Sequence, residues 1–266
     1  MARTRSDLAG LSRVHTAAGV ATTLGATSGP ESFLLSTDHL AALTATVVVC
    51  GALPIAARTH PGRWTRLVSQ GLAVLLIASV VAYQLVVALG GQFEADSDLP
   101  LQLTDIVTVI AALALWSRSL LLFELTYFWG LTASLLAVLT PGLDPDDGFP
   151  SFFFWHYFVT HSGVVLAGLF LAFGLGLTAR SGAVRRVFLA TLAWAAVATV
   201  GNAFTGGNYM FLRERPRTPS MLDYMGPWPW YILSASLLAL GLFALLDLPF
   251  RTRRERALIP SKAEVG

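Results

Sequence analysis

The chain contains seven separate runs of mostly apolar residues, each close to the ~20 residues that a helix needs to cross a bilayer. Hydrophobic residues make up 55% of the chain, and only 13% are charged, about half the share usual in soluble domains. This pattern predicts an all-α, polytopic transmembrane helical bundle with about seven spans. The predicted spans are His39–Ala57, Leu67–Leu89, Leu99–Trp116, Leu120–Leu139, Phe152–Phe173, Val184–Phe204 and Trp228–Leu248.

The segments between these runs are too short to form a second folded domain. We therefore expect an N-terminal extramembrane segment (residues 1–37), one transmembrane domain (38–250) and a basic C-terminal tail (251–266). The N-terminal segment lacks the apolar core and cleavage site of a signal peptide. A net charge of +2 gives no indication of a nucleic-acid partner, and the single cysteine, Cys50, cannot form an internal disulfide. No cofactor and no metal site is predicted.

The basic residues are distributed unequally between the two sides of the predicted bundle. With the loops assigned alternately to the two sides, twelve arginines and lysines share the side of the C-terminus, and six lie on the other. Because basic loops stay in the cytoplasm, we expect a multi-pass protein of the cell membrane with its N-terminus outside and its C-terminus cytoplasmic. The third and fifth spans then begin at the outer end, and the sixth span ends there.

The fifth run is unusual because its first half carries two histidines, His156 and His161. An ionisable side chain inside a membrane helix is costly unless it faces the bundle interior or water. His161 has the reference pKa of a general base near neutral pH. Alternatively it forms only a structural hydrogen bond, and Tyr157, one turn earlier on the same face, is the simplest partner. The two histidines lie five residues apart, so their rings point about 140° apart on a regular helix and are not expected to share a metal.

A hydroxyl and a carboxylate stand next to each other near the outer end of the third span. Thr104 in such a helix ordinarily bonds a carbonyl one turn back, and Asp105 can cap a helix that begins later than Leu99. Together with His161, however, they are the parts of a nucleophile, base and orienter set. As a catalytic set, Thr104 is the candidate nucleophile, His161 the candidate base and Asp105 the candidate orienter, and the structural interpretation of these residues stays open beside it.

The loop before the last span is rich in polar residues. Its arginines either bind a phosphate or carboxylate as forks or form a solvated basic loop, and they are Arg213, Arg215 and Arg217. The predicted topology brings this loop to the same end as the other candidates, so we expect one polar pocket lined by Thr104, Asp105, His161, Asn202 and Asn208. The candidate substrate-binding residues are His156, Asn202, Asn208, Tyr209, Arg213, Arg215 and Asp223. Glu124 begins the fourth span at the opposite end and is not expected to reach the pocket.

Several motifs between Leu99 and Tyr231 occur in an order typical of one protein family. They are LPLQLTD (Leu99–Asp105), ELTYFWGL (Glu124–Leu131), FPS followed by HSG (Phe149–Gly163), GGNYMFLR (Gly206–Arg213) and PSMLDYMGPWPWY (Pro219–Tyr231). With these motifs the chain resembles the YwaF family of bacterial multi-pass integral membrane proteins. That family is similar to a eukaryotic group of multi-pass acyltransferases that remodel ether phospholipids, and more distantly to the androgen-induced membrane hydrolases, which use a threonine and a histidine on lipid esters.

The resemblance carries an expectation about the reaction. In the family's LPLxLCD motif a cysteine usually stands where this chain has Thr104, and the histidine of its H-x-G motif falls on His161. The resemblance therefore implies a lipid acyltransferase or esterase with a Thr–His pair, with membrane lipids as partners and a phospholipid or acyl lipid as substrate. The alternative is a non-enzymatic transporter or receptor that binds a small or lipid ligand in the same pocket.

Overall fold

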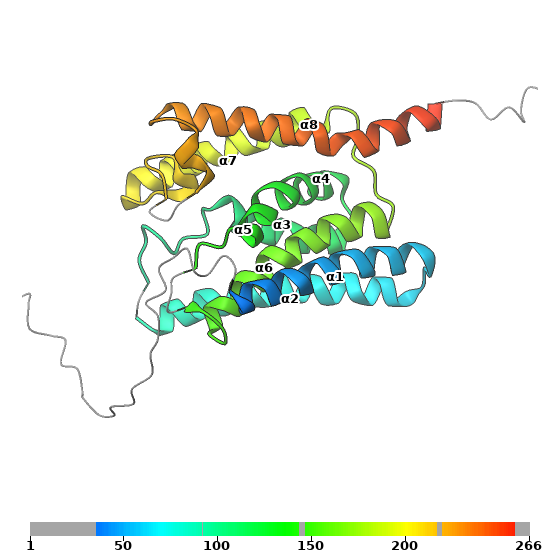
Figure 1. The fold of residues 1–266 in the computed structure, drawn as a ribbon, viewed down its shortest axis with the longest axis horizontal. Coiled ribbons are helices and arrows are strands. Elements are labelled where there is room, and N and C mark those ends of the chain that lie inside the picture. Colours follow the sequence, from blue (N-terminus) through cyan, green and yellow to red (C-terminus); the bar gives the residue numbers. More distant parts are fainter. Residues whose placement is uncertain (1–35, 92, 144–146, 217–219, 259–266) are drawn as a thin grey trace, which may run out of the picture.

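The computed structural model describes residues 36–91, 93–143, 147–216 and 220–258, and all regular secondary structure in them is helical (Figure 1). The predicted all-α bundle is thus confirmed. The main helices are α1 (Thr37–Thr59), α2 (Arg63–Leu89), α3 (Leu103–Ser117), α4 (Leu120–Trp129), α5 (Leu135–Leu139), α6 (Phe152–Leu169), α7 (Ala183–Thr205) and α8 (Trp230–Leu258).

Six helical segments in the described part of the chain are long and apolar enough to cross a membrane, and α3 is a shorter apolar helix. A π-helical turn, Gly130–Ser134, joins α4 to α5 in one such segment, and a second, Phe170–Gly174, extends α6. The seven crossings expected from the apolar runs are therefore six full-length helical segments and the short α3.

The predicted start of the third span is wrong. The apolar run predicts a start at Leu99, but α3 begins at Leu103. The Asp105 Oδ2 atom accepts a hydrogen bond from the backbone N–H of Gln102 at 3.0 Å, and this contact fixes the first turn at that point. The 15 residues of α3 span about 22 Å at 1.5 Å per residue, which is less than the ~30 Å of a typical hydrocarbon core.

Two other helices extend beyond their predicted spans, and in both the additional residues include charged ones. The second span was expected from Leu67, but α2 begins at Arg63, so its first turns carry arginines. The last span was expected to end at Leu248, but α8 continues to Leu258, into the predicted tail. There Asp247 pairs with both Arg251 and Arg254 at 2.9 Å. Apolar runs mark only the part of a helix that meets lipid or core, whereas hydrogen bonding continues into the polar zone. Residues 1–35 and 259–266 of the predicted terminal segments lie outside the described residues.

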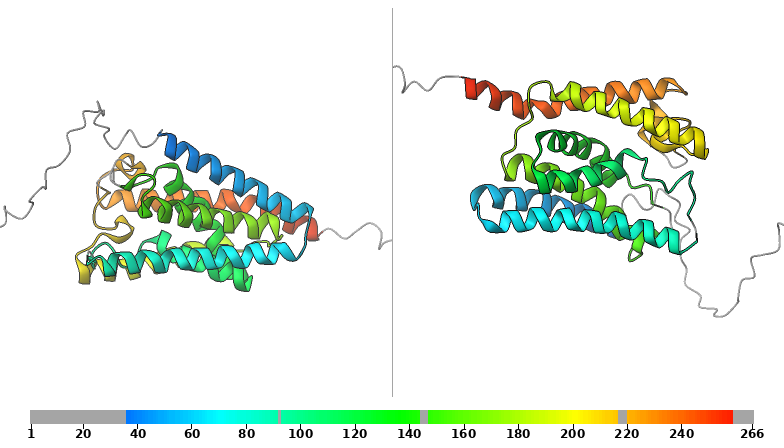
Figure 2. Two further views of the ribbon diagram at one scale, coloured as in Figure 1. Left: turned by 90° about the horizontal axis from the view of Figure 1, so that it is seen from below. Right: turned by 180° about the vertical axis from the view of Figure 1, so that it is seen from behind.

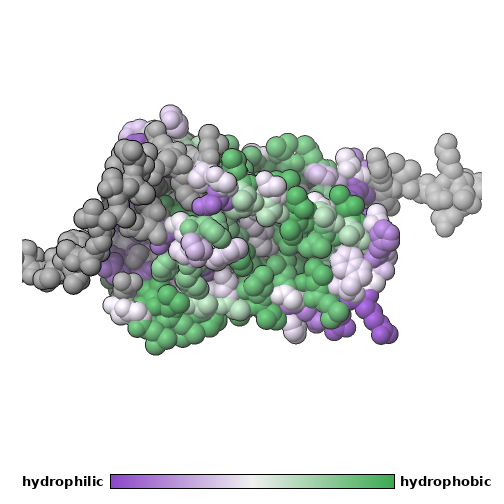
Figure 3. Space-filling view, turned by 60° about the horizontal axis from the view of Figure 1, so that its bottom comes forward, coloured by the Kyte–Doolittle hydropathy of each residue, from purple (hydrophilic) through white to green (hydrophobic). Residues whose placement is uncertain are grey.

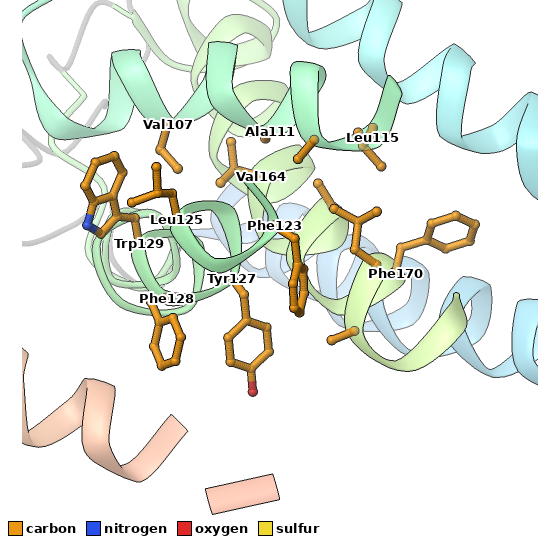
Figure 4. Close-up of a cluster of buried hydrophobic side chains, with 14 of the residues drawn as sticks. Val107, Ala111, Leu115, Phe123, Leu125, Tyr127, Phe128, Trp129, Val164 and Phe170 are labelled. Carbon is orange, nitrogen blue, oxygen red and sulfur yellow. The ribbon is translucent and has the colours of Figure 1, made fainter. Parts of the chain in front are cut away.

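The helices form three layers (Figures 1 and 2). The first layer is α1 with α2, the middle layer is α3 to α6, and the third layer is α7 with α8. The core lies in the middle layer, where Val107, Phe123, Val164 and Phe170 are fully buried (Figure 4). On the face shown in Figure 3 apolar residues cover much of the middle of the molecule, and strongly hydrophilic residues lie mostly toward its two ends. An apolar belt with polar ends is what a membrane-spanning bundle requires.

A buried carboxylate joins the middle layer to the third layer. The Glu124 side chain on α4 is fully buried and accepts hydrogen bonds from the guanidinium groups of Arg180 and Arg186, at 2.9 to 3.1 Å. Arg180 lies in the connection before α7, where its side-chain hydrogen bonds to Glu124 raise the pKa of its guanidinium. Arg254 of α8 donates to the carbonyl of Ala179 at 2.6 Å in the same connection. Glu124 therefore lies away from the polar pocket, as predicted, and its ion pairs link α4 to the connection before α7 and to α7 itself.

The helix order also makes the proposed orientation testable. Ser97 and Ser181 are both exposed, Ser97 between α2 and α3 and Ser181 between α6 and α7, so they lie at opposite ends of the bundle. In a Cys50→Ala background, we expect an impermeant maleimide to label Ser97→Cys in intact cells but to label Ser181→Cys only after permeabilisation. Labelling in the reverse order would contradict an outer N-terminus and a cytoplasmic C-terminus.

Candidate functional site

A polar cavity of about 220 Å³ opens between α2, α3 and α6. We call it the α3–α6 cavity. It lies at the end of the bundle where α2 finishes and where α3 and α6 begin. Its lining residues are Val80, Tyr83, Gln84, Ser97, Asp98, Leu99, Pro100, Gln102, Thr104, Asp105, Thr108, His156, Tyr157, Thr160 and His161.

Four of the candidate residues meet in this cavity. Thr104 and Asp105 line it from the first turn of α3, and His156 and His161 line it from the first half of α6. Residues about fifty positions apart in the sequence therefore share one polar space, as the topology predicted for Thr104, Asp105 and His161. Asn202 is expected to line the same pocket but is not among its lining residues.

The Thr104 hydroxyl has no hydrogen-bond partner among the described residues, although the neighbouring threonines do. Thr108 donates to the carbonyl of Thr104 at 2.8 Å, and Thr160 donates to the carbonyl of His156 at 2.7 Å. These two follow the usual pattern of threonine in a membrane helix. Thr104 departs from that pattern because the chain one turn earlier is not helical. Its hydroxyl remains available to a molecule in the cavity.

The His161 side chain also keeps an unpaired atom. Its Nδ1 is buried and has no hydrogen-bond partner in the described part of the chain. The alternative interpretation, a hydrogen bond between Tyr157 and His161, is not found among the described residues, because the Tyr157 hydroxyl donates to the carbonyl of Ala137 at 2.9 Å. The two rings pack edge to face with their centroids 4.3 Å apart. A buried polar atom without a partner is costly, and it distinguishes His161 from His156, whose Nδ1 lies 3.1 Å from the Ser79 hydroxyl.

His156 is held from two sides at the wall of the cavity. Its Nδ1 lies 3.1 Å from the Ser79 hydroxyl, and its ring stacks on Tyr83 with the centroids 4.6 Å apart. The Tyr83 hydroxyl in turn donates to a carboxylate oxygen of Asp98 at 3.2 Å. These contacts leave His156 a part of the wall, with less freedom to transfer protons than His161. Tyr83 and Asp98 lie in different segments and form no motif, so the sequence alone does not identify them as part of the site.

Gln102 is a further polar residue of the cavity that the sequence analysis did not identify. Its Oε1 accepts a hydrogen bond from the backbone N–H of Met210 at 2.8 Å, which orients the side-chain amide. Its Nε2 has no partner among the described residues. The sequence feature that could have identified Gln102 is its position directly before α3, two residues from Thr104.

The loop after α7 positions the cavity wall from outside. Asn202 is buried, and its side chain binds the backbone N–H and carbonyl of Tyr209 at 2.6 and 3.0 Å. The Tyr209 hydroxyl accepts from the N–H of Leu99 and donates to the carbonyl of Ala95, both at 2.9 Å. Gly207 lies so close to the backbone of Asp96 that a Cβ would collide with it. The loop is therefore docked on the segment that leads into α3.

The remaining candidates of this loop contact the loop itself. Asn208 accepts hydrogen bonds from the N–H groups of Arg213 and Glu214, at 3.0 and 3.2 Å. The Arg213 guanidinium donates to the carbonyl of Gly206 at 2.7 Å, and Arg215 lies 3.6 Å from a carboxylate oxygen of Asp223. None of these residues lines the α3–α6 cavity, and Arg217 lies outside the described residues.

The comparisons with known proteins agree with the membrane architecture. No curated protein and no solved structure matches the chain significantly. A family model does match, and it covers residues 34–247, which include every described helix except the end of α8. Most of the chain thus fits a single family pattern, and the protein belongs to the TMEM164 family.

Proposed function

We propose that the protein is a lipid acyltransferase or esterase that acts on an acyl lipid in the α3–α6 cavity. In this proposal Thr104 is the nucleophile and His161 is the general base. One observation carries it: the two side chains come from different helices and line the same cavity. In the described structure His161 Nδ1 is buried without a partner, and the Thr104 hydroxyl forms no hydrogen bond. The resemblance to the YwaF family, and through it to membrane acyltransferases, supports the same pair.

The chemistry needs only these two groups at the reacting centre. The Thr104 oxygen attacks the carbonyl carbon of a lipid ester while the His161 imidazole takes the hydroxyl proton. The tetrahedral intermediate then expels the lipid alcohol, which receives that proton from the imidazole, and an acyl-threonine remains. Attack by water on the acyl-threonine makes the protein an esterase, and attack by a lysophospholipid hydroxyl makes it an acyltransferase.

Two neighbours support this pair in the proposal. The unpaired Nε2 of Gln102 is the donor in the cavity for the oxyanion of the tetrahedral intermediate, because its Oε1 is already bound to the loop. Asp105 is a positioning residue, since its carboxylate binds the backbone N–H of Gln102. It orients the set by fixing the first turn of α3, which carries Thr104.

The packing below the cavity favours this chemistry over transport. A transporter needs a polar route that continues to the other side of the membrane. Beneath Thr104 and His161 the interior is filled by fully buried apolar side chains, including Val107, Ala111 and Val164 (Figure 4). A site that ends on a close-packed apolar floor suits a substrate that enters and leaves from the same side.

Covalent labelling tests the proposal directly. We expect a long-chain fluorophosphonate, which reacts with activated hydroxyls, to form an adduct that peptide mass spectrometry locates on Thr104. The adduct is expected to be absent in Thr104→Ala and at least about tenfold slower to form in His161→Ala, because the base activates the hydroxyl. Thr132→Ala is the matched control, since that hydroxyl donates to the carbonyl of Phe128 and lies outside the cavity. If Thr104→Ala is labelled as strongly as the unchanged protein, Thr104 is not the nucleophile.

A further inference from the structure

A second cavity, of about 250 Å³, lies at the opposite end of the α2–α3 pair. We call it the arginine cavity. The first turns of α2, the last turn of α3 and the short connection to α4 form its walls. Its lining residues are Arg66, Ser69, Gln70, Leu115, Trp116 and Arg118. None of them belongs to the α3–α6 cavity or takes part in the proposed reaction.

The charge of the arginine cavity is not compensated within the described structure. No carboxylate lines it, and the guanidinium groups of Arg66 and Arg118 form no ion pair or hydrogen bond with any described residue. Two carboxylates at this end of the molecule, Glu124 and Asp247, are each already paired with two arginines. Two arginines that share a cavity without an acid attract an anion from outside the chain.

The backbone at Arg118 is a separate observation. This residue ends α3 with φ of 55° and ψ of 25°, in the left-handed region that favours glycine. Arginine gains nothing from this conformation, and a glycine there would relieve the strain. A left-handed residue is a common way to end a helix, and at the end of α3 an arginine occupies this position in place of the usual glycine.

The other lining residues complete a site for a phosphate group. Arginine guanidinium groups bind phosphate oxygens in pairs of parallel hydrogen bonds. The Gln70 amide is uncommitted in the described structure, whereas the Ser69 hydroxyl already donates to the carbonyl of Leu115 at 2.7 Å. Trp116 is 62% exposed, and tryptophan in this position is typical of the headgroup level of a membrane.

From these observations we propose that the arginine cavity binds a phosphate group, carried by the headgroup of an anionic phospholipid or by free phosphate. The predicted orientation places the cavity on the cytoplasmic side, where anionic lipids are concentrated. The site is independent of the α3–α6 cavity, because fully buried side chains such as Val107 and Ala111 separate the two along α3.

Two binding experiments on the full chain separate the sources of the phosphate. In one, inorganic phosphate is titrated into protein in neutral detergent, and the thermal unfolding midpoint is followed. In the other, native mass spectrometry counts the lipids retained from nanodiscs that contain equal parts of phosphatidylglycerol and phosphatidylcholine. A headgroup site predicts selective retention of phosphatidylglycerol, and a free-phosphate site predicts a saturable rise of the midpoint with inorganic phosphate alone.

Matched variants show whether the cavity is responsible. We expect Arg66→Gln with Arg118→Gln to weaken the observed binding by about tenfold or more, whereas Arg185→Gln, an exposed arginine at the same end on α7, leaves it unchanged. Arg118→Gly is the sharpest variant, because it removes the guanidinium and relieves the backbone. It is expected to weaken binding while the unfolding midpoint stays the same or rises, so the weaker binding is not due to unfolding. Binding in neither experiment, or equal loss in Arg185→Gln, overturns the proposal.

Discussion

Replacing Thr104 with alanine is expected to lower kcat/KM for a lipid ester by about a thousandfold or more, because it removes the nucleophile. The fold should persist. The Thr104 hydroxyl has no partner in the described structure, so its loss changes the free energy of unfolding by about 1 kcal/mol at most. The measurement is the release of fatty acid, or its transfer to an added lysophospholipid, by purified protein in mixed micelles, with the thermal unfolding midpoint recorded for each variant.

His161→Ala should reduce turnover to a similar extent, because the base and the nucleophile act as one unit. The double variant Thr104→Ala with His161→Ala is then expected to be no slower than either single variant. Thr132→Ala, which removes a threonine hydroxyl outside the cavity, is the control and should keep full activity. Additive losses in the double variant would show that the two side chains do not share one step.

Thr104→Cys is the informative exchange. It introduces the residue that the resembling family usually carries at this position, and a thiol is intrinsically more nucleophilic than a hydroxyl, so activity is expected to be kept or raised. Full activity in Thr104→Ala together with its loss in His161→Ala would mean that water attacks and that the protein is a histidine-assisted hydrolase. If neither change affects turnover of any acyl lipid, the transporter or receptor reading replaces the enzyme.

The sequence predicted the helices well and their ends less well. Runs of apolar residues report where a helix contacts lipid or core, so the number and order of the spans followed from them. The start of α3 depended on the contact between Asp105 and Gln102, which hydropathy does not reveal. The extension of α8 depended on ion pairs around Asp247, which lie beyond the apolar run.

The part of the candidate site that depends only on the order of the spans was predicted from the sequence. The alternation of basic loops placed Thr104 and His161 at the same end of the bundle, and the structure brings both to one cavity. The distribution of basic loops did not distinguish residues that line the cavity from residues that support its wall. Asn202 is buried, and its side chain forms hydrogen bonds to the backbone of Tyr209. This role depends on how the loop folds back on the end of α7.

The arginine cavity was not predicted for a different reason. In the sequence, Arg66 and Arg118 count among the basic residues that orient a membrane protein, and such residues need no specific partner. Only the packing of α2 against α3 brings these two together around a space without a carboxylate. Charge statistics describe a side of the membrane, whereas a binding site depends on which charges remain uncompensated at one place.

Replacing Glu124 with glutamine is expected to lower the free energy of unfolding by about 3 kcal/mol. The fully buried carboxylate is the common acceptor for two guanidinium groups, and the amide would direct an N–H group at one of these donors. Arg180 and Arg186 are partly exposed, with side-chain accessibilities of 44% and 33%. They recover some hydration when they lose their partner, so the expected loss is at the lower end of the range for a broken buried ion pair. Denaturant titration in detergent micelles measures it.

The same variant shows what the ion pairs hold together. Because Arg180 and Arg186 belong to the connection before α7 and to α7 itself, their release is expected to loosen α7 and α8 before the middle layer unfolds. Hydrogen exchange should then increase first in α7 and α8, and later in α3 and α6. The control is Asp223→Asn, which breaks the partly exposed pair of Asp223 with Arg215 and should cost less than about 1 kcal/mol. Equal losses in the two variants would mean that the buried carboxylate contributes no more than a surface ion pair, and that apolar packing alone holds the third layer.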